Sequence, residues 1–514
     1  MKIVSGKQMR EIERIAIEER GVPSILLMEN AALSLAKHCL RILDGKKNPK
    51  VMIVCGLGNN GGDGMALARH LYTKGIDTEI FFIGDVSKVK GDPVTYLEVV
   101  KKLEIPFKTT PPDHAAIGSC DLVVDAIFGT GLDRNIDAQY ENIIMAINEH
   151  AKYVLSVDIP SGINSGTGQI MGCAVKAAET VTFAYSKTGL YIYPGAAHAG
   201  KIHVEDISLP VSGKDIIKTE ILTDSEAAQL LPKRAARSNK GSFGKIMILA
   251  GSNEMPGAAS LASSAAYITG GGLVNACVLE NVAKVIHYWQ REIITRVLPG
   301  NNGMYCKKSA ENLVEEISRS DVIVLGPGIG RSSDVTEFVL EVIGMAEVPL
   351  VLDADALFAL SEDINVLKKL KAPCIITPHP GEMSRLTGLP IPAILENPLE
   401  AAVNFSKKFN VVTLLKDAHT IIASPQGDVF INTTGNNSLA KAGTGDVLAG
   451  MIAGFIAGCK TGCKAEGCDP YTAGKLAAFI HGKAGEAASA ELSNYSVSAS
   501  DLLKHIPVII KNLS

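Results

Sequence analysis

Short apolar runs that end in glycine or acidic loops recur along this chain and constrain its fold more than any other feature. The first such run covers residues 51–55, the glycine-rich loop 56–64 follows, and residues 65–74 have helical character. A run that is apolar at every position is typical of a parallel strand buried on both faces. Strand, glycine loop and helix together begin a βαβ unit, so we predict an α/β protein with doubly wound parallel sheets.

The same order occurs in two separate series. Strands of the first series are expected at 51–55, 78–83, 122–128 and 153–157, with closing strands at 181–184, 190–193 and 201–206. Strands of the second are expected at 245–250, 322–325, 350–352, 374–376 and 411–415. The chain has 514 residues, more than one core usually serves, and charge rises between 210 and 240. We therefore predict two three-layer αβα domains, residues 1–215 and 216–514.

Charge and cysteine usage exclude several classes of protein. A net charge of −4 gives no basic field for nucleic acid or for an acidic membrane. The start of the chain has neither a signal peptide nor a membrane span, so we expect a cytoplasmic protein. We also expect a homo-oligomer. Cys459, Cys463 and Cys468 lack a fourth ligand, so no zinc site is expected there.

The Gly-Thr-Gly-Asp run at residues 443–446 opens a small-residue apolar helix expected over 447–457. A glycine turn at the start of a buried helix directs free backbone N–H groups, and the positive end of the helix dipole, at whatever lies in front of it. Such a turn can hold a phosphate. An aspartate would repel phosphate there unless it acts on a hydroxyl that is being phosphorylated. Asp446 is therefore predicted to be a general base, the alternative being a plain helix cap.

Two other nucleotide-binding motifs are present only in weak form. Residues 56–61 match the dinucleotide fingerprint, which allows a hydride-transferring dehydrogenase. The amides of Asn59 and Asn60 and the carboxylate of Asp63 instead favour a hard cation or a sugar. Residues 195–201 have Walker A spacing, but Ile202 replaces the hydroxyl that binds Mg²⁺. We therefore expect the phosphate donor at residues 443–446.

Taken together, the motifs resemble those of a known enzyme family. Residues 59–64, 124–131 and 157–162 are similar to the epimerase domain of the NAD(P)H-hydrate repair enzymes. Residues 240–245, 251–252, 255–258, 325–328, 352–357, 377–382 and 443–446 are similar to the dehydratase domain of that family. The resemblance covers nearly the whole chain, in the order usual for bifunctional members. It implies a Rossmann-like first domain and a ribokinase-like second domain.

The resemblance also implies a site for a hydrated nicotinamide nucleotide in the first domain. Its residues would be Asn59, Asn60, Gly61, Gly62, Asp63, Gly129, Thr130, Gly131, Leu132, Asp133, Arg134, Asn135, Tyr140 and Asp158. Asn60, Asp125 and Ser161 would bind K⁺. Asp158 would be the acid–base residue, although it could instead be a structural carboxylate that satisfies the backbone of the turn 159–162. A structural role is also open for Asp125.

In the second domain the resemblance implies two ligands. Ala258, Gly328, His379 and Asp446 would contact the hydrated substrate, although His379 could also be an ordinary turn histidine. Lys416, Asp417, Ala418, His419, Thr420 and Gly445 would hold ADP or ATP, with Mg²⁺ bridging the donor phosphates. Ala442 and Asp417 depart from the family pattern, which usually has glycine at both positions.

The resemblance thus implies epimerisation of the R and S hydrates of NADH and NADPH, and nucleotide-dependent dehydration of the S form. One rival is a sugar or vitamin kinase, in which Asp446 would activate an alcohol and the product would keep its phosphate. Another is a binding module whose first domain is a nucleotide-sensing scaffold without catalysis.

Overall fold

The computed structural model describes residues 1–210, 213, 216–458 and 469–514. Cys459, Cys463 and Cys468 lie outside the described residues. The chain forms two compact units: an N-terminal unit, Lys2–Thr219, and a C-terminal unit, Glu220–Ser514 together with Met1. Among the described residues, no helix combines the length and the apolar character needed to cross a membrane.

The N-terminal unit is built on a seven-stranded sheet in the order β4-β3-β2-β5-β6-β7-β9, and every neighbouring pair is parallel. The strands are β2 (Lys50–Cys55), β3 (Asp77–Phe82), β4 (Phe107–Lys108), β5 (Leu122–Ala126), β6 (Val154–Val157), β7 (Glu179–Phe183) and β9 (Lys201–Glu205). A separate parallel pair consists of β1 (Lys2–Val4) and β8 (Ser186–Lys187).

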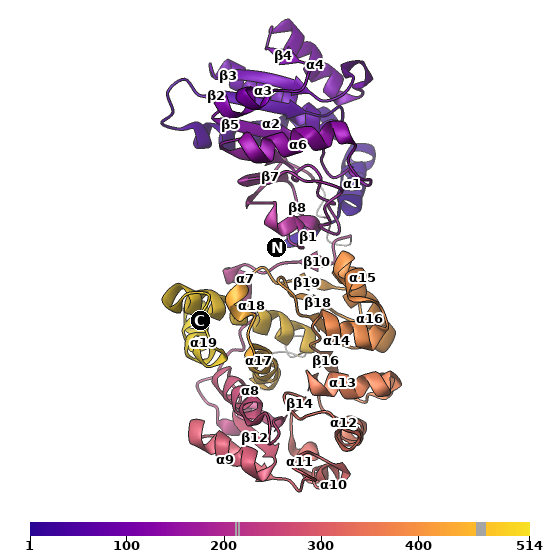
Figure 1. Cartoon of the computed structure of the whole chain (residues 1–514), viewed down its shortest axis with the longest axis vertical. Coiled ribbons are helices and arrows are strands. Elements are labelled where there is room, and N and C mark those ends of the chain that lie inside the picture. Colours follow the sequence, from indigo (N-terminus) through magenta and orange to yellow (C-terminus); the bar gives the residue numbers. More distant parts are fainter. Residues whose placement is uncertain (211–212, 214–215, 459–468) are drawn as a thin grey trace. The chain divides into compact units, whose positions relative to one another are not determined.

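Helices cover both faces of this sheet (Figure 1). They are α1 (Gly6–Arg14), α2 (Ser24–Leu43), α3 (Asn59–Thr73), α4 (Asp92–Lys102), α5 (His114–Ser119) and α6 (Ala138–His150), with short helical turns η1 (Ile15–Glu19), η2 (Val86–Lys88), η3 (Thr188–Leu190) and η4 (Gly195–Ala197). On β2, Ile53 packs in a core with α2, α3 and α4, whereas Met52 and Val54 pack in a second core with α5 and α6. Both faces are buried, which explains why the strand is apolar at every position.

Two sequence-based expectations in this unit are wrong. The first helix after β2 begins at Asn59 rather than at residue 65, so the glycine-rich loop is the first turn of α3. Residues 190–193 form no strand; the 3₁₀ turn Thr188–Leu190 stands there, and Leu190 and Ile192 are buried in a loop. Burial alone produced the apolar pattern that predicted a strand.

The C-terminal unit has a sheet in the order β13-β12-β11-β14-β15-β16-β17-β18-β19. Its strands are β11 (Lys245–Leu249), β12 (Leu273–Val278), β13 (Ile294–Val297), β14 (Val322–Leu325), β15 (Leu350–Leu352), β16 (Cys374–Ile376), β17 (Val412–Leu415), β18 (Ile421–Ala423) and β19 (Val429–Ile431); β10 (Thr219–Glu220) lies where the units divide. Strands from β13 to β17 are parallel, and β18 and β19 are antiparallel additions.

Helices also pack on this second sheet (Figure 1). They are α7 (Asp224–Leu230), α8 (Pro256–Ile268), α9 (Glu280–Trp289), α10 (Lys307–Glu311), α11 (Val314–Arg319), α12 (Ser333–Met345), α13 (Asp355–Glu362), α14 (Pro380–Thr387), α15 (Ile391–Glu396), α16 (Pro398–Phe409), α17 (Thr444–Gly458), α18 (Pro470–Leu492) and α19 (Ala499–Leu513), with 3₁₀ turns η5 (Lys240–Phe243), η6 (Ile364–Lys369) and η7 (Asn437–Leu439). The predicted class, α/β with two doubly wound sheets, is confirmed.

Two glycines one turn apart fix α17 against α8. A Cβ at Gly450 would lie 2.1 Å from the carbonyl oxygen of Ala262, and one at Gly454 would lie 1.9 Å from Oγ1 of Thr269. The two helices therefore approach closely only because these positions carry no side chain. This packing holds the N-terminus of α17, and the run 443–446, at the carboxyl edge of the sheet.

Candidate active sites

A cavity of about 590 Å³ lies at the carboxyl edge of the N-terminal sheet, lined by the loops that follow β2, β5 and β6 and by α1 and α2. Strand order changes direction between β2 and β5, which is where open α/β sheets bind ligands. The predicted residues that line it are Asn59, Asn60, Asp63, Gly129, Thr130, Gly131, Leu132, Asp133, Arg134, Tyr140 and Asp158. The structure therefore brings most of the predicted epimerase site together.

Three predicted residues are not among those that line the cavity. A Cβ at Gly61 would lie 2.0 Å from the carbonyl oxygen of Gly56, and one at Gly62 would lie 2.8 Å from Sδ of Met28. These glycines let α3 begin tightly against the strand and helix beside it. Asn135 is exposed on the loop after β5.

Asp158 directs its carboxylate away from the turn that follows it. Its Oδ1 lies 2.5 Å from Nζ of Lys187 and accepts a hydrogen bond from Thr182 Oγ1 at 3.0 Å. The backbone N–H of Ser161 in that turn donates to Asp125 instead, at 2.9 Å. Asp158 also has a φ of 67°, an uncommon value that concentrates at functional sites. The carboxylate that supports the turn is therefore Asp125, and Asp158 faces the cavity.

Three of the carboxyl groups that line this cavity interact with one another and with the ammonium group of Lys187. They are Asp63, Asp158 and Glu13. Burial raises the pKa of Asp63 well above its ordinary value, and the charges of Asp158 and Glu13 add to the shift. Burial also raises the pKa of Glu13. The ammonium of Lys187 pairs with Asp158 and only partly offsets the upward shift in the pKa of Asp63.

Asp125 and Ser161 form a buried cluster next to the cavity. Asp125 Oδ1 accepts from Ser161 Oγ at 2.5 Å, and its Oδ2 accepts from Ser156 Oγ at 2.8 Å. Burial raises the pKa of Asp125. Asn60 lies beside Gly129, where a Cβ would be 3.2 Å from the amide oxygen of Asn60, and its buried amide nitrogen has no hydrogen-bond partner. An oxygen-rich cluster of this kind suits a hard monovalent or divalent cation.

In the C-terminal unit the loops after the parallel strands bring the predicted substrate residues to one edge. Gly328 follows β14 with a φ of 63°, and a Cβ there would lie 2.8 Å from Cβ of Ala258 at the start of α8. Lys416 follows β17, and its Nζ lies 2.7 Å from Oδ1 of Asp353, which follows β15. A Cβ at Gly445 would lie 3.6 Å from that Nζ, so the start of α17 meets the same ion pair.

Asp446 lies in the first turn of α17, partly buried. Its pKa is raised to about 7, mainly by burial and then by the carboxylate of Asp353, while Lys416 acts in the opposite direction. Burial would lower the pKa of Lys416, but Asp353 and Glu382 outweigh burial and raise it. A carboxyl group with a pKa near 7 is suited to accept a proton at neutral pH.

The remaining predicted residues of this unit occupy more open positions. His379 begins α14, where its Nδ1 accepts from the N–H of Gly381 at 3.0 Å, and its side chain is 57% exposed. The ring thus serves as a helix cap, and its Nε2 lies 3.5 Å from Oε1 of Glu382. Asp417 and Ala418 are exposed, and His419 and Thr420 are partly buried.

Several side chains of these sites were not predicted. Lys187 and Glu13 line the N-terminal cavity, yet each is far from Asp158 in sequence and has no motif of its own. Asp353 and Glu382 interact with Lys416 in the C-terminal unit. Asp353 did carry a signal, because an acid directly after a parallel strand lies at the ligand-binding edge.

The fold and the two sites define an α/β protein with two chemically distinct centres. One is an acidic cavity suited to proton transfer. The other is a carboxyl group of neutral pKa at a helix N-terminus, an arrangement suited to phosphoryl transfer to a hydroxyl.

Comparisons with known proteins give the family. A family described as NAD(P)H-hydrate dehydratase matches residues 246–508, and one described as YjeF-related protein N-terminus matches residues 24–189. The bifunctional NAD(P)H-hydrate repair enzyme Nnr of Moorella thermoacetica is 38% identical, covering 100% of this chain and 97% of that protein. Nnr of Thermofilum pendens is 33% identical over the same shares. The chain belongs to the family of bifunctional NAD(P)H-hydrate repair enzymes.

A solved structure supports the fold of the larger unit. A ribokinase-like superfamily protein from Enterococcus faecalis V583 is similar with a TM-score of 0.50 at 24% identity, covering 58% of this chain and 97% of that one. At this identity the likeness shows a ribokinase-like fold and nothing further. The resemblance stated from the sequence motifs is confirmed.

Proposed function

We propose that the N-terminal domain, residues 1–215, epimerises the R and S hydrates of NADH and NADPH. The C-terminal domain, residues 216–514, then dehydrates the S hydrate at the expense of ADP or ATP. The observation that carries the proposal is Asp446, a partly buried carboxyl group with a pKa of about 7 at the glycine turn that opens α17. Membership of the repair family supports both activities.

Epimerisation needs a hydroxyl to leave and return on the opposite ring face. The hydroxyl is on the ring carbon next to nitrogen, so the nitrogen lone pair expels it once a proton is supplied. Asp63, whose pKa is raised by burial, is suited to donate that proton. Asp158, paired with Lys187, is suited to accept a proton from the water that adds back. That proton then passes from Asp158 to Asp63, which returns both groups to their starting states.

Dehydration needs hydroxide converted into a good leaving group. Asp446 takes the proton of the ring hydroxyl, whose oxygen attacks the terminal phosphoryl group of ADP or ATP and releases AMP or ADP. Phosphate then leaves with the ring oxygen, the neighbouring ring carbon loses a proton, and NADH or NADPH results. Backbone N–H groups at the start of α17 would stabilise the charge that develops on the phosphoryl oxygens.

The side chains present in the two sites are suited to bind the cations that the family resemblance implies, K⁺ and Mg²⁺. Asn60, Asp125 and Ser161 supply the amide, carboxylate and hydroxyl oxygens that K⁺ takes as ligands, and Asp125 and Ser161 are in direct contact. K⁺ would supply a fixed positive charge next to the cavity. Mg²⁺ binds few carboxylates plus phosphate oxygens, and Asp353 and Glu382 are carboxylates of the right kind. Mg²⁺ would neutralise charge on the donor phosphates.

We also propose the binding roles of the remaining predicted residues. In the epimerase these are Asn59, Gly61, Gly62, Gly129, Thr130, Gly131, Leu132, Asp133, Arg134, Asn135 and Tyr140. In the dehydratase Ala258, Gly328 and His379 would contact the substrate, and Lys416, Asp417, Ala418, His419, Thr420 and Gly445 the nucleotide. Arg134 and Lys416 are cations suited to phosphate groups. A cytoplasmic location and a homo-oligomer stay predictions.

The decisive assay separates this proposal from a kinase. Purified protein is incubated with hydrated NADH and with ADP or ATP in parallel, and NADH absorbance, inorganic phosphate and phosphorylated products are followed. Return of NADH with one phosphate released per turnover is expected. A stable phosphorylated product, with no NADH formed, would establish the kinase instead.

A second assay separates catalysis from scaffolding in the first domain. Asp158→Asn is compared with the unmodified protein for interconversion of the two hydrates and for binding of the hydrate. Lost interconversion with retained binding is expected. If neither protein interconverts the hydrates, the domain is a binding module.

A further inference from the structure

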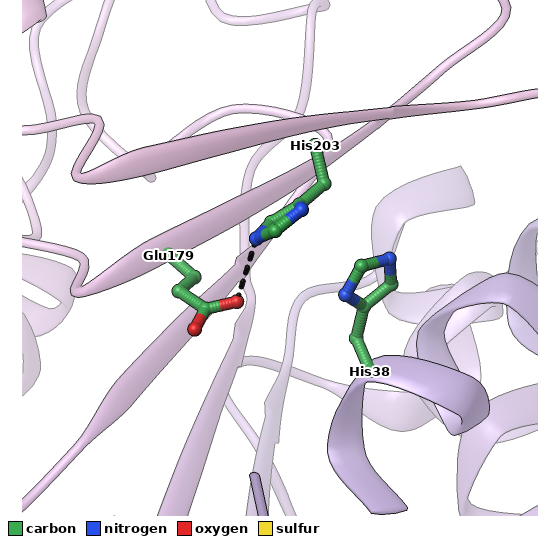
Figure 2. Close-up of side chains that lie close together, drawn as sticks. All are labelled: His38, Glu179 and His203. Atoms are coloured by element: carbon green, nitrogen blue, oxygen red, sulfur yellow. Dashed lines mark ion pairs between the residues drawn. The ribbon is translucent and has the colours of Figure 1, made fainter. Parts of the chain in front are cut away.

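A cluster of histidine and glutamate side chains lies in the N-terminal unit among residues that do not line the cavity. It consists of His38 on α2, Glu179 at the start of β7 and His203 on β9 (Figure 2). One ligand atom from each residue lies within 4.8 Å of the others. His38 and His203 are 165 positions apart in the chain, so no local sequence motif contains the three residues.

The fold places the three side chains on one face. In the parallel pair β7 and β9, Glu179 is opposite Lys201 and Val181 is opposite His203. Because side chains alternate along a strand, Glu179 and His203 therefore point to the same face of the sheet. Val181 on that face packs in the core that also contains residues of α2. The helix thus lays His38 over the two strand residues.

His38 presents a nitrogen that the protein leaves without a partner. The residue is only 5% exposed, and its Nε2 lies 2.8 Å from Oε1 of Glu205. A carboxylate only accepts hydrogen bonds, so Nε2 is the donor in this pair and Nδ1 is left for another ligand. That Nδ1 is buried and meets no hydrogen-bond partner among the described residues. Figure 2 shows a ring nitrogen of His38 directed toward the other two residues.

The side chains of Glu179 and His203 also lie close to each other and to His38. Nε2 of His203 lies 2.8 Å from Oε2 of Glu179, yet the pair lacks hydrogen-bond geometry. Oε1 of Glu179 accepts a hydrogen bond from the hydroxyl of Tyr153 at 2.6 Å, which holds the carboxylate in place. Within the described part of the chain, Nδ1 of His38 and Nε2 of His203 are both buried without a hydrogen-bond partner, and they lie beside this carboxylate.

We propose that His38, Glu179 and His203 bind a divalent transition-metal ion, with Zn²⁺ as the preferred occupant. Two histidines and one glutamate form a known three-ligand set for zinc, and a solvent molecule would complete four-coordination. Bonds of about 2.0–2.1 Å place tetrahedral ligands roughly 3.4 Å apart, so small rotations of the side chains close the site. Glu205 holds His38 as the outer carboxylate found behind many metal-bound histidines.

The ion would fasten α2 to the β7–β9 edge of the sheet. Arg41 now pairs with Glu179, and its side chain is 50% exposed, so it can turn to solvent when a divalent ion enters. The cation of Arg41 and the metal compete for one carboxylate. Removing Arg41 should therefore strengthen metal binding, whereas a plain ion-pair network would gain no affinity for metal.

The test uses the full-length protein, stripped with EDTA and dialysed, and titrated with Co²⁺ and then Zn²⁺. One equivalent of Co²⁺ should give the intense visible absorption of four-coordinate cobalt, and Zn²⁺ should displace it. His38→Ala and His203→Ala should each weaken binding at least 100-fold, and Glu205→Gln should weaken it about 10–100-fold. Arg41→Ala should tighten it. Circular dichroism and interconversion of the hydrates, which takes place in the same unit, check that each variant is folded.

A matched control is the second histidine pair of this unit. His114 and His150 stack with ring centroids 4.3 Å apart, and the double change to alanine should leave Co²⁺ binding as it was. The proposal is overturned if Arg41→Ala, which keeps every ligand, binds no Co²⁺ at micromolar concentration. It is equally overturned if His38→Ala retains the signal, or if a thiolate charge-transfer band shows that cysteines hold the ion.

Discussion

The ionisation of Asp446 gives the sharpest prediction for the dehydratase. Its pKa is raised to about 7, and a general base works only when ionised. Dehydration should therefore rise with pH through 7, with about half of Asp446 ionised at that pH and about one-tenth at pH 6. Epimerisation depends on the other unit and should not share this inflection.

Two neighbours of Asp446 allow the origin of the shift to be tested. Lys416 lowers the pKa of Asp446 and Asp353 raises it, although the two groups lie only 2.7 Å apart. For unit charges on the order of 6 Å apart at an effective dielectric constant of about 20, Coulomb's law gives about 2.8 kcal/mol, or about 2 pH units. Lys416→Met should thus move the inflection up by about 1–2 pH units, and Asp353→Asn should move it down.

The assay is the pH dependence of kcat/KM for dehydration, measured by NADH absorbance with the S hydrate and ADP. Both variants will also lower the rate, so the readout is the position of the inflection rather than its height. Ionisation of ADP is common to all the proteins and cancels in the comparison. Shifts of the two variants in the same direction, or no shift in either, would refute the assignment of Asp446 as the titrating base.

Three further outcomes follow from the geometry. Gly443 has a φ of 90°, and a Cβ there would lie 2.8 Å from Leu261, so Gly443→Ala should lower the free energy of unfolding in urea by about 1–3 kcal/mol. A Cβ at Gly257 meets nothing within 4 Å, so Gly257→Ala should change that free energy by less than about 0.5 kcal/mol. Equal effects of the two substitutions would contradict the packing argument. Asp63→Asn should slow interconversion of the hydrates roughly 10²–10⁴-fold and leave dehydration intact, and an unchanged rate would exclude Asp63 as the acid. Burial lowers the pKa of His481 to about 4 from 6.5, so between these pH values the unfolded state binds one proton more and stability falls as pH drops from 6.5 to 4. His481→Gln should remove about 3 kcal/mol of this loss of stability, measured by acid unfolding. If the dependence of stability on pH is unaltered, the ring is not buried in its neutral form.

The parallel strands were predictable because both faces of each sheet are buried. Continuous apolar runs such as 51–55 and 322–325 have few alternatives to a central strand. The start of α3 at Asn59 was not predictable from propensity, because glycines at 61, 62 and 64 disfavour a helix until tertiary packing stabilises it. Tertiary packing, absent from a single sequence, decided that boundary.

The candidate active sites likewise contain some residues that could be predicted from the sequence and others that could not. Asp158, which directly follows β6, could be found because strand ends converge at one edge, and Asp446 could be found because a glycine turn opens the helix that carries it. Lys187 could not, because its role depends on Asp158, a partner 29 positions away just after another strand. The alternative in which Asp158 supports its turn was resolved only by the hydrogen bond from Ser161 to Asp125. A contact between residues far apart in the chain leaves no pattern in the local sequence.

The central claim is tested most directly by the rate at which the full-length protein carrying Asp446→Asn dehydrates the S hydrate. The substituted protein is given the S hydrate with ADP and then a mixture of both hydrates, so that NADH return and hydrate interconversion are measured on one sample. The account predicts that dehydration falls roughly 10²–10⁴-fold while interconversion continues at its usual rate. Dehydration within about threefold of the unmodified protein would contradict it, because removing a general base costs far more than that.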